Sequence, residues 1–180
     1  MSDFDLAIAV VLANEGGYVF DPEDPGGETF RGISRKDFPA WPGWAAVDAA
    51  KRLPNFGAAV MRDASLLQEA KDFYHASFWN PLYEQINSQA VATKLLDTSV
   101  NMGMATAVRL LQQAIGYLCA GPVVTDGIFG ARTLDFVNGA SEADLFRELR
   151  ARAAKRHHDV AIANAAEEKF VLGWFRRDVQ

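Results

Sequence analysis

The segment from residue 16 to residue 34 limits the fold more than any other part of the sequence. It reads GGYVFDPEDPGGETFRGIS, with two pairs of adjacent glycines, two prolines and a further glycine at position 32. Proline lacks a backbone donor and glycine favours turns, so this density of both residues denies a helix and allows only turns or short strands. We therefore expect a loop or a small hairpin here.

The rest of the chain has the periodicity of helices. From Phe4 to Asn14 apolar residues recur at helical spacing, with Ser2 or Asp3 as the N-cap, and Glu15 follows in the next turn. Further helices are expected over residues 44–52, 65–78, 90–101, 105–116, 131–138, 142–165 and 167–177. This pattern predicts a mainly α protein with a small loop or β-hairpin subdomain.

Composition excludes several classes of function. The chain has 180 residues, 49% of them apolar, and a formal net charge of -5, which fits one globular domain, or a main domain with a small subdomain, and gives no broad attraction for nucleic acid. The first 17 residues are too acidic and their apolar run too short for a signal peptide or a membrane span. We expect a monomer with no nucleic-acid partner, no membrane insertion and, with Cys119 alone, no intrachain disulfide.

Carboxylates in the early segment are candidates for catalysis. Glu15 falls at the end of the first helix, where the negative end of the helix dipole disfavours an ionised carboxylate and suits a general acid. Asp24 follows nine residues later and Thr29 five residues after that, within a loop able to fold back. Hydrolysis of a glycosidic bond needs two carboxyl groups in different environments, and this spacing permits it.

Two other interpretations of the same segment remain open. An acidic loop rich in proline and glycine is also typical of a solvated surface turn. Asp21, Glu23, Asp24 and Glu28 could supply oxygen ligands to a calcium ion, but they lack the alternating pattern and the closing glutamate of an EF-hand. His157 and His158 are adjacent and diverge on a helix, so no zinc pattern exists, and we expect neither a metal nor an organic cofactor.

The stretch EGGYVFDPEDPGGETFRGIS resembles the signature of glycoside hydrolase family 108, the bacterial and phage N-acetylmuramidases also known as secretion activators. The stretches FYHASFWNPLYEQI, LLDTSVNMG and TDGIFGARTLDFVN resemble later landmarks of that family, the last belonging to a helical peptidoglycan-binding subdomain. The resemblance implies a lysozyme-like fold, a catalytic portion over residues 1–88, and a helical portion over 89–180 that includes this subdomain, packed as one globular unit.

The resemblance also implies roles for individual residues. Glu15 takes the place of the family's essential glutamate, and Asp24 and Thr29 take the places of the Asp and Thr that follow it. The Glu-to-Asp interval of phage lysozymes is kept, but the Asp-to-Thr interval is one residue shorter. Phe20 and Phe30 replace asparagines that are frequent in the family, so substrate preference is expected to differ.

Aromatic and polar residues elsewhere are candidates for binding a glycan strand. Tyr18 neighbours Glu15, and Trp79 and Tyr83 flank the Asn-Pro break, although each of these rings taken singly is more typical of a core than of a cleft. Asn101 either faces the substrate groove or caps the turn at Gly103. We include Tyr18, Trp79, Tyr83 and Asn101 in the predicted substrate site.

The sequence thus predicts a peptidoglycan hydrolase that cleaves the β-1,4 bond between N-acetylmuramic acid and N-acetylglucosamine. The alternative is a protein without catalytic activity that binds peptidoglycan or assists secretion. Either would be made in the cytoplasm without a signal peptide and would act on glycan strands of the wall, in the periplasm, after release or export.

Overall fold

The computed structural model describes residues 1–20, 27–119, 122–164 and 171–178, and its contacts divide the chain into two compact units. Unit 1 contains Met1–Val10 and Phe78–Gln180, and unit 2 contains Val11–Ser77. Helix α1 (Phe4–Glu15) belongs to unit 1 in its first part and to unit 2 in its last turns. The division into a catalytic portion, 1–88, and a helical portion, 89–180, was predicted from the family resemblance and stays a prediction.

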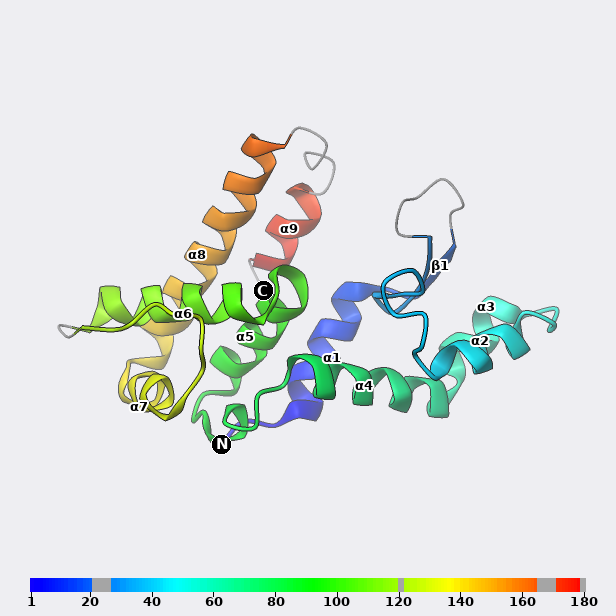
Figure 1. Ribbon diagram of the computed structural model, residues 1–180, viewed down its shortest axis with the longest axis horizontal. Coiled ribbons are helices and arrows are strands. Elements are labelled where there is room, and N and C mark those ends of the chain that lie inside the picture. Colours follow the sequence, from blue (N-terminus) through cyan, green and yellow to red (C-terminus); the bar gives the residue numbers. More distant parts are fainter. Residues whose placement is uncertain (21–26, 120–121, 165–170, 179–180) are drawn as a thin grey trace. The chain divides into compact units, whose positions relative to one another are not determined.

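Unit 2 contains the small sheet and three helices (Figure 1). Strands β1 (Tyr18–Phe20), β2 (Glu28–Phe30) and β3 (Ile33–Ser34) are antiparallel in that order. Along β2, Glu28 and Phe30 are buried while Thr29 is half-buried, which is the alternation of a strand with one packed face. The helices are α2 (Gly43–Ala50), α3 (Phe56–Arg62) and α4 (Ala64–Phe78), whose last residue belongs to unit 1.

Unit 1 is a helical assembly. After the short 3-10 helix η1 (Tyr83–Gln85) come α5 (Gln89–Met102), α6 (Met104–Leu118), α7 (Ala131–Gly139), α8 (Glu142–Ala163) and α9 (Val171–Asp178). Helix α8 packs against α5, α6 and α9 (Figure 1). The interior is aliphatic and contains the fully buried side chains of Leu95, Leu96, Leu111, Ile115, Leu145 and Leu149.

The mainly α class and the small β-hairpin subdomain are confirmed. Asp3 is the residue that caps α1, because its Oδ1 accepts the N–H of Leu6 at 3.2 Å. Helix α3 was not predicted, because its seven residues are too few to show a period. Helix α6 continues past Gly116, where we expected it to end, since a helical glycine costs only about 1 kcal/mol and tertiary packing outweighs that.

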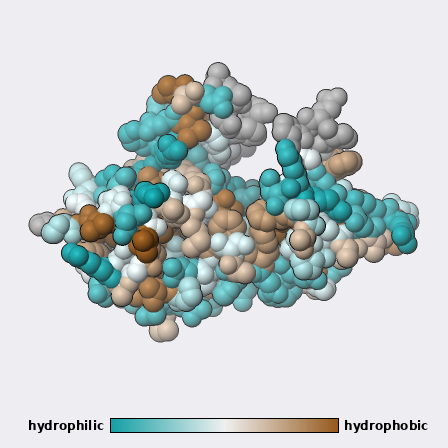
Figure 2. Space-filling model, in the orientation of Figure 1, coloured by the Kyte–Doolittle hydropathy of each residue, from teal (hydrophilic) through white to brown (hydrophobic). Residues whose placement is uncertain are grey.

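No helix in the described ranges is both long and apolar enough to span a membrane. Figure 2 shows hydrophilic and hydrophobic side chains interspersed over the visible face, with the hydrophobic ones in small groups. Scattered exposed apolar side chains of this kind are normal for a protein surface.

Candidate active site

Glu15 lies at the C-terminal end of α1, where the helix stops because Gly16 adopts a φ of +78°. Its side chain is half-buried. The carboxylate lies close to the backbone of Gly32, since a Cβ added there would be only 2.4 Å from Oε2 of Glu15. The sequence predicted Glu15 at a helix end, and the structure adds a second segment beside its carboxylate.

That second segment is the two-residue turn between β2 and β3. Phe30 pairs with Ile33, and Arg31 and Gly32 between them have φ values of +47° and +82°. Positive φ at both central residues is the requirement of the commonest tight hairpin turn. Arginine rarely adopts this conformation, and strained backbone of this kind is found most often at functional sites.

Two hydrogen bonds hold this turn in place. The N–H of Arg31 donates to the carbonyl of Gly17 at 2.9 Å, which ties the turn to the exit of α1. The hydroxyl of Tyr74, on α4, donates to the carbonyl of Arg31 at 2.7 Å. Tyr74 is only 2% exposed, so its ring is fixed by packing. Helix α1, the β2–β3 turn and helix α4 therefore meet at Glu15.

Thr29 stands in the middle of β2, paired with Val19 on one side and Ser34 on the other. Its side chain projects from the face opposite Glu28 and Phe30 and remains half-buried, so its hydroxyl is not enclosed in the core. Asp24, the second predicted carboxylate, lies outside the described residues. The structure thus places Glu15, at the end of α1, and Thr29, on β2, in the same unit.

A cluster of charged side chains packs against the other face of the sheet. Glu28 is 8% exposed, forms ion pairs with Nε of Arg35 at 2.8 Å and Nζ of Lys51 at 2.7 Å, and accepts a hydrogen bond from the hydroxyl of Tyr18 at 2.8 Å. Arg35 and Lys51 also pair with Asp48 at 2.7 and 3.0 Å. These contacts anchor the hairpin to α2, which positions the strand that carries Thr29.

The cluster perturbs its own titrating groups. Burial, followed by the hydrogen bond to Glu28, raises the pKa of Tyr18 to about 12. Hydrogen bonds from Arg35 and then Lys51 lower the pKa of Asp48 to about 2. Because two cations already satisfy Glu28, it is poorly suited to the calcium loop considered above. No group of carboxylates, histidines and cysteines in the described residues could hold a metal ion.

The predicted substrate residues are distributed over both units. The Tyr18 ring packs edge-on against Phe56 with centroids 4.6 Å apart, and its hydroxyl is engaged by Glu28. Trp79 is 5% exposed and Tyr83 is fully buried, with the two rings edge to face at 5.4 Å. Burial raises the pKa of Tyr83 to about 12, partly offset by the Ser99 hydroxyl. In this conformation the rings of Trp79 and Tyr83 serve packing in unit 1.

Asn101 has a partner that neither interpretation of the sequence foresaw. Its Oδ1 lies 3.1 Å from Nε2 of His157, which joins α5 to α8. The His157 ring is itself buried and stacked on Trp174 at 4.8 Å. The N–H of Gly103 donates instead to Ser99. Asn101 therefore organises unit 1 in this conformation, and its contact with substrate stays a prediction.

Sequence reasoning missed Arg31, Gly32 and Tyr74, the residues that surround Glu15. A signal for the turn was present, because FRGI contains a glycine between two apolar residues of short strands. Tyr74 lies four residues from Ala70 and eight from Leu66, the spacing of a buried helix face. Nothing in the sequence indicated that this face meets the turn.

Comparison with known proteins covers almost the whole chain. Residues 8–103 match the family described as Glycosyl hydrolase 108, and residues 106–179 match the one described as Predicted Peptidoglycan domain. Among solved structures, the chain is similar to the one titled "Structure of Brucella abortus SagA", with 28% identity and a TM-score of 0.65 over 98% of this chain and 89% of that one. No sequence among the curated proteins matches the chain. The predicted lysozyme-like, mainly helical fold agrees with these matches.

Proposed function

Because the chain belongs to the glycosyl hydrolase 108 family, we propose that it is a lysozyme-type N-acetylmuramidase, which hydrolyses the β-1,4 bond between N-acetylmuramic acid and N-acetylglucosamine. The family makes it a glycoside hydrolase, and the C-terminal domain makes peptidoglycan its partner. Its action is on the cell wall, where that polymer is found. What we propose beyond the family is which bond is cleaved and which residues carry out the reaction.

In the proposed reaction Glu15 is the general acid. It donates a proton to the bridging oxygen as the bond to the muramic acid carbon breaks, and water supplies a hydroxyl to that carbon and returns a proton to the carboxylate. Asp24 either stabilises the positive charge that develops on the sugar or positions the water, and Thr29 orients that water. No metal or organic cofactor takes part in these steps.

The position of Glu15 is the observation that most supports this role. A general acid must hold its proton at one place relative to the bond, and displacement of about 1 Å can cost a hundredfold in rate. Gly32 brings the turn against the carboxylate, and Tyr74 holds the turn through the Arg31 carbonyl. A glutamate that only ended a helix in solvent would not need a turn held against its carboxylate.

The experiment that tests the proposal compares three proteins on purified sacculi. Wild type should release soluble muropeptides, and Glu15→Gln should release them at least about a hundredfold more slowly, since general acid catalysis contributes about 10²–10⁴-fold. Glu142→Gln removes the same charge from an exposed position at the start of α8, in unit 1, and should be unaffected. Binding to sacculi is measured by pelleting in parallel. Wild type that pellets with sacculi but releases nothing would favour the alternative of a non-catalytic binding protein.

A further inference from the structure

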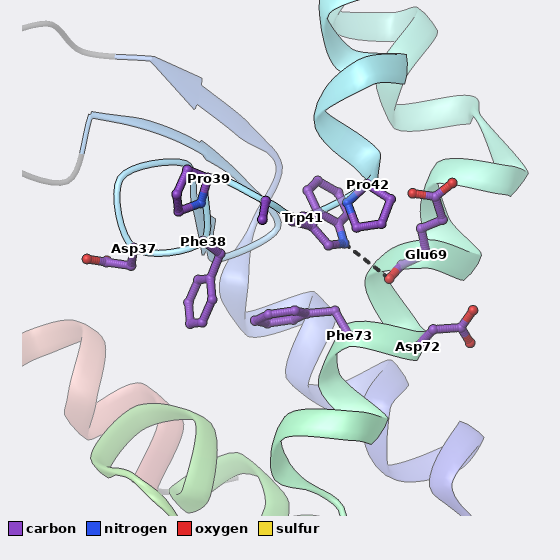
Figure 3. Close-up of a pocket in the computed structure, with 9 residues that line it drawn as sticks. Asp37, Phe38, Pro39, Trp41, Pro42, Glu69, Asp72 and Phe73 are labelled. Carbon is purple, nitrogen blue, oxygen red and sulfur yellow. Dashed lines mark hydrogen bonds between the residues drawn. The ribbon is translucent and has the colours of Figure 1, made fainter.

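A pocket of about 480 Å³ opens between residues 37–42 and helix α4, entirely within unit 2 (Figure 3). Its size falls in the usual range for small-molecule sites. The rings of Phe38 and Phe73 face each other edge to face with centroids 4.7 Å apart, and Trp41 lies beside Pro42. Neither Glu15 nor Thr29 is among its lining residues, so the proposed chemistry does not account for this pocket.

Acidic groups surround the aromatic rings. The pocket is lined by Asp37, Glu69 and Asp72, whose carboxyl groups Figure 3 shows turned outward around the rings, and by no basic residue. Lys36 and Lys71 are neighbours in sequence but do not line it. One carboxylate oxygen of Glu69 is covered by protein and has no hydrogen-bond partner among the described residues. A ligand in the pocket cannot reach this covered oxygen, so an amine there would pair with the other oxygen of Glu69 and with the exposed carboxylates of Asp37 and Asp72.

We propose that this pocket binds a primary ammonium group attached to a carbon skeleton. An ammonium has three N–H donors and a positive charge, so it can pair with carboxylates at the rim while the carbons next to it contact the rings. Aromatic faces also attract cations directly. A neutral sugar would contact the rings but would bring no charge to pair with the carboxylates of the rim.

Two sources in peptidoglycan carry this chemistry. One is the free amine of a diamino acid in the peptide stems, and the other is a glucosamine unit that has lost its acetyl group. The choice of polymer rests on the proposed function, whereas recognition of the ammonium rests only on the residues that line the pocket. The pocket would then add affinity for wall that contains free amines.

The test uses the full chain with Glu15→Gln, so that no ligand is cleaved. Calorimetric titration compares a lysine-containing dipeptide, a glucosamine tetramer and the fully N-acetylated tetramer. We expect one or both amine ligands to bind at least about tenfold more tightly than the N-acetylated tetramer, from charge pairing together with a cation–π contact. The tighter of the two amines identifies the source.

Variants locate the binding in the pocket. Adding Glu69→Gln or Asp72→Asn should weaken the amine ligands about three- to tenfold, whereas adding Glu142→Gln in unit 1 should leave them unchanged. Asp72 is exposed, so its variant folds even if Glu69→Gln does not. No binding of either amine to folded protein would overturn the proposal. Equal, pocket-dependent binding of the N-acetylated tetramer would also overturn it and would indicate a glycan subsite. Neither result depends on whether sacculi are hydrolysed.

Discussion

Replacing Gly32 with alanine should displace the carboxylate of Glu15. The new Cβ would lie 2.4 Å from Oε2 of Glu15 and 2.6 Å from the hydroxyl of Tyr74, both closer than the 3.0 Å that real Cβ contacts respect. The Tyr74 ring is fixed by packing, so the turn has to withdraw from its hydroxyl by about 0.4 Å, and the flexible carboxylate of Glu15 has to move by about 0.6 Å relative to the turn. A shift of that size should reduce the rate of hydrolysis about 10- to 100-fold.

The same change also strains the backbone, and a second glycine separates the two effects. Gly32 has a φ of +82°, where alanine costs about 1–2 kcal/mol. Gly103 has a φ of +85° and a ψ of 145° with no atom within 4 Å of an added Cβ, so Gly103→Ala strains the backbone without any collision. Gly32→Ala should lose about 1–2 kcal/mol in urea unfolding from strain and a further ~1–3 kcal/mol from overpacking, whereas Gly103→Ala should lose about 1–3 kcal/mol from strain alone.

The assay is muropeptide release from sacculi at a temperature where both variants are folded by circular dichroism. Gly103→Ala should retain the wild-type rate and Gly32→Ala should not. If Gly32→Ala hydrolyses sacculi as fast as Gly103→Ala does, the carboxylate does not need its place beside the turn, and the reasoning about restraint at Glu15 is wrong.

The other predictions concern the supports of the site and of the second domain. Tyr74→Phe removes the donor to the Arg31 carbonyl and should cost about 1–3 kcal/mol in urea unfolding; unchanged stability would show that the bond is not formed in solution. The pKa of Asp48 is lowered by Arg35, so its contribution to stability is complete above the unfolded value near 4 and is lost as pH falls toward 2. Asp48→Asn should therefore flatten the fall of Tm between about pH 4 and pH 2, and an equally steep fall would refute this. Gln112 is 2% exposed and holds the Asp-Gly turn before α7 through three side-chain hydrogen bonds to residues 126–128. Gln112→Leu should therefore lower the free energy of unfolding by about 2–4 kcal/mol and weaken binding to sacculi. Unchanged binding by the folded variant would show that this turn is dispensable for wall contact.

Most helices could be predicted because their apolar residues repeat at helical spacing. The hairpin could be predicted because proline and glycine exclude a helix from residues 16–34. Helix α3 escaped prediction because it is short and its only buried residue is Val60. Gly116 was taken as a helix end, but it does not adopt the positive φ that Gly103 adopts at the end of α5, and α6 continues through it.

The site could be predicted only in part, because local signals identify residue types and not their neighbours. Glu15 was placed at a helix end by the glycines that follow it. Its approach to Gly32, and the bond from Tyr74 to a carbonyl 43 residues earlier, arise from tertiary packing. The rings of Trp79 and Tyr83 can pack in a core, which is the more typical place for each, or line a sugar groove, and only the fold decides between the two.

The central claim is that Glu15 delivers a proton to a glycosidic oxygen of peptidoglycan, and mass spectrometry of borohydride-reduced products from digested sacculi tests it most directly. Wild type should yield fragments that end in reduced N-acetylmuramic acid, and Glu15→Gln should yield almost none. Fragments that end in reduced N-acetylglucosamine, products of peptide or amide cleavage, or equal yields from the two proteins would contradict the claim.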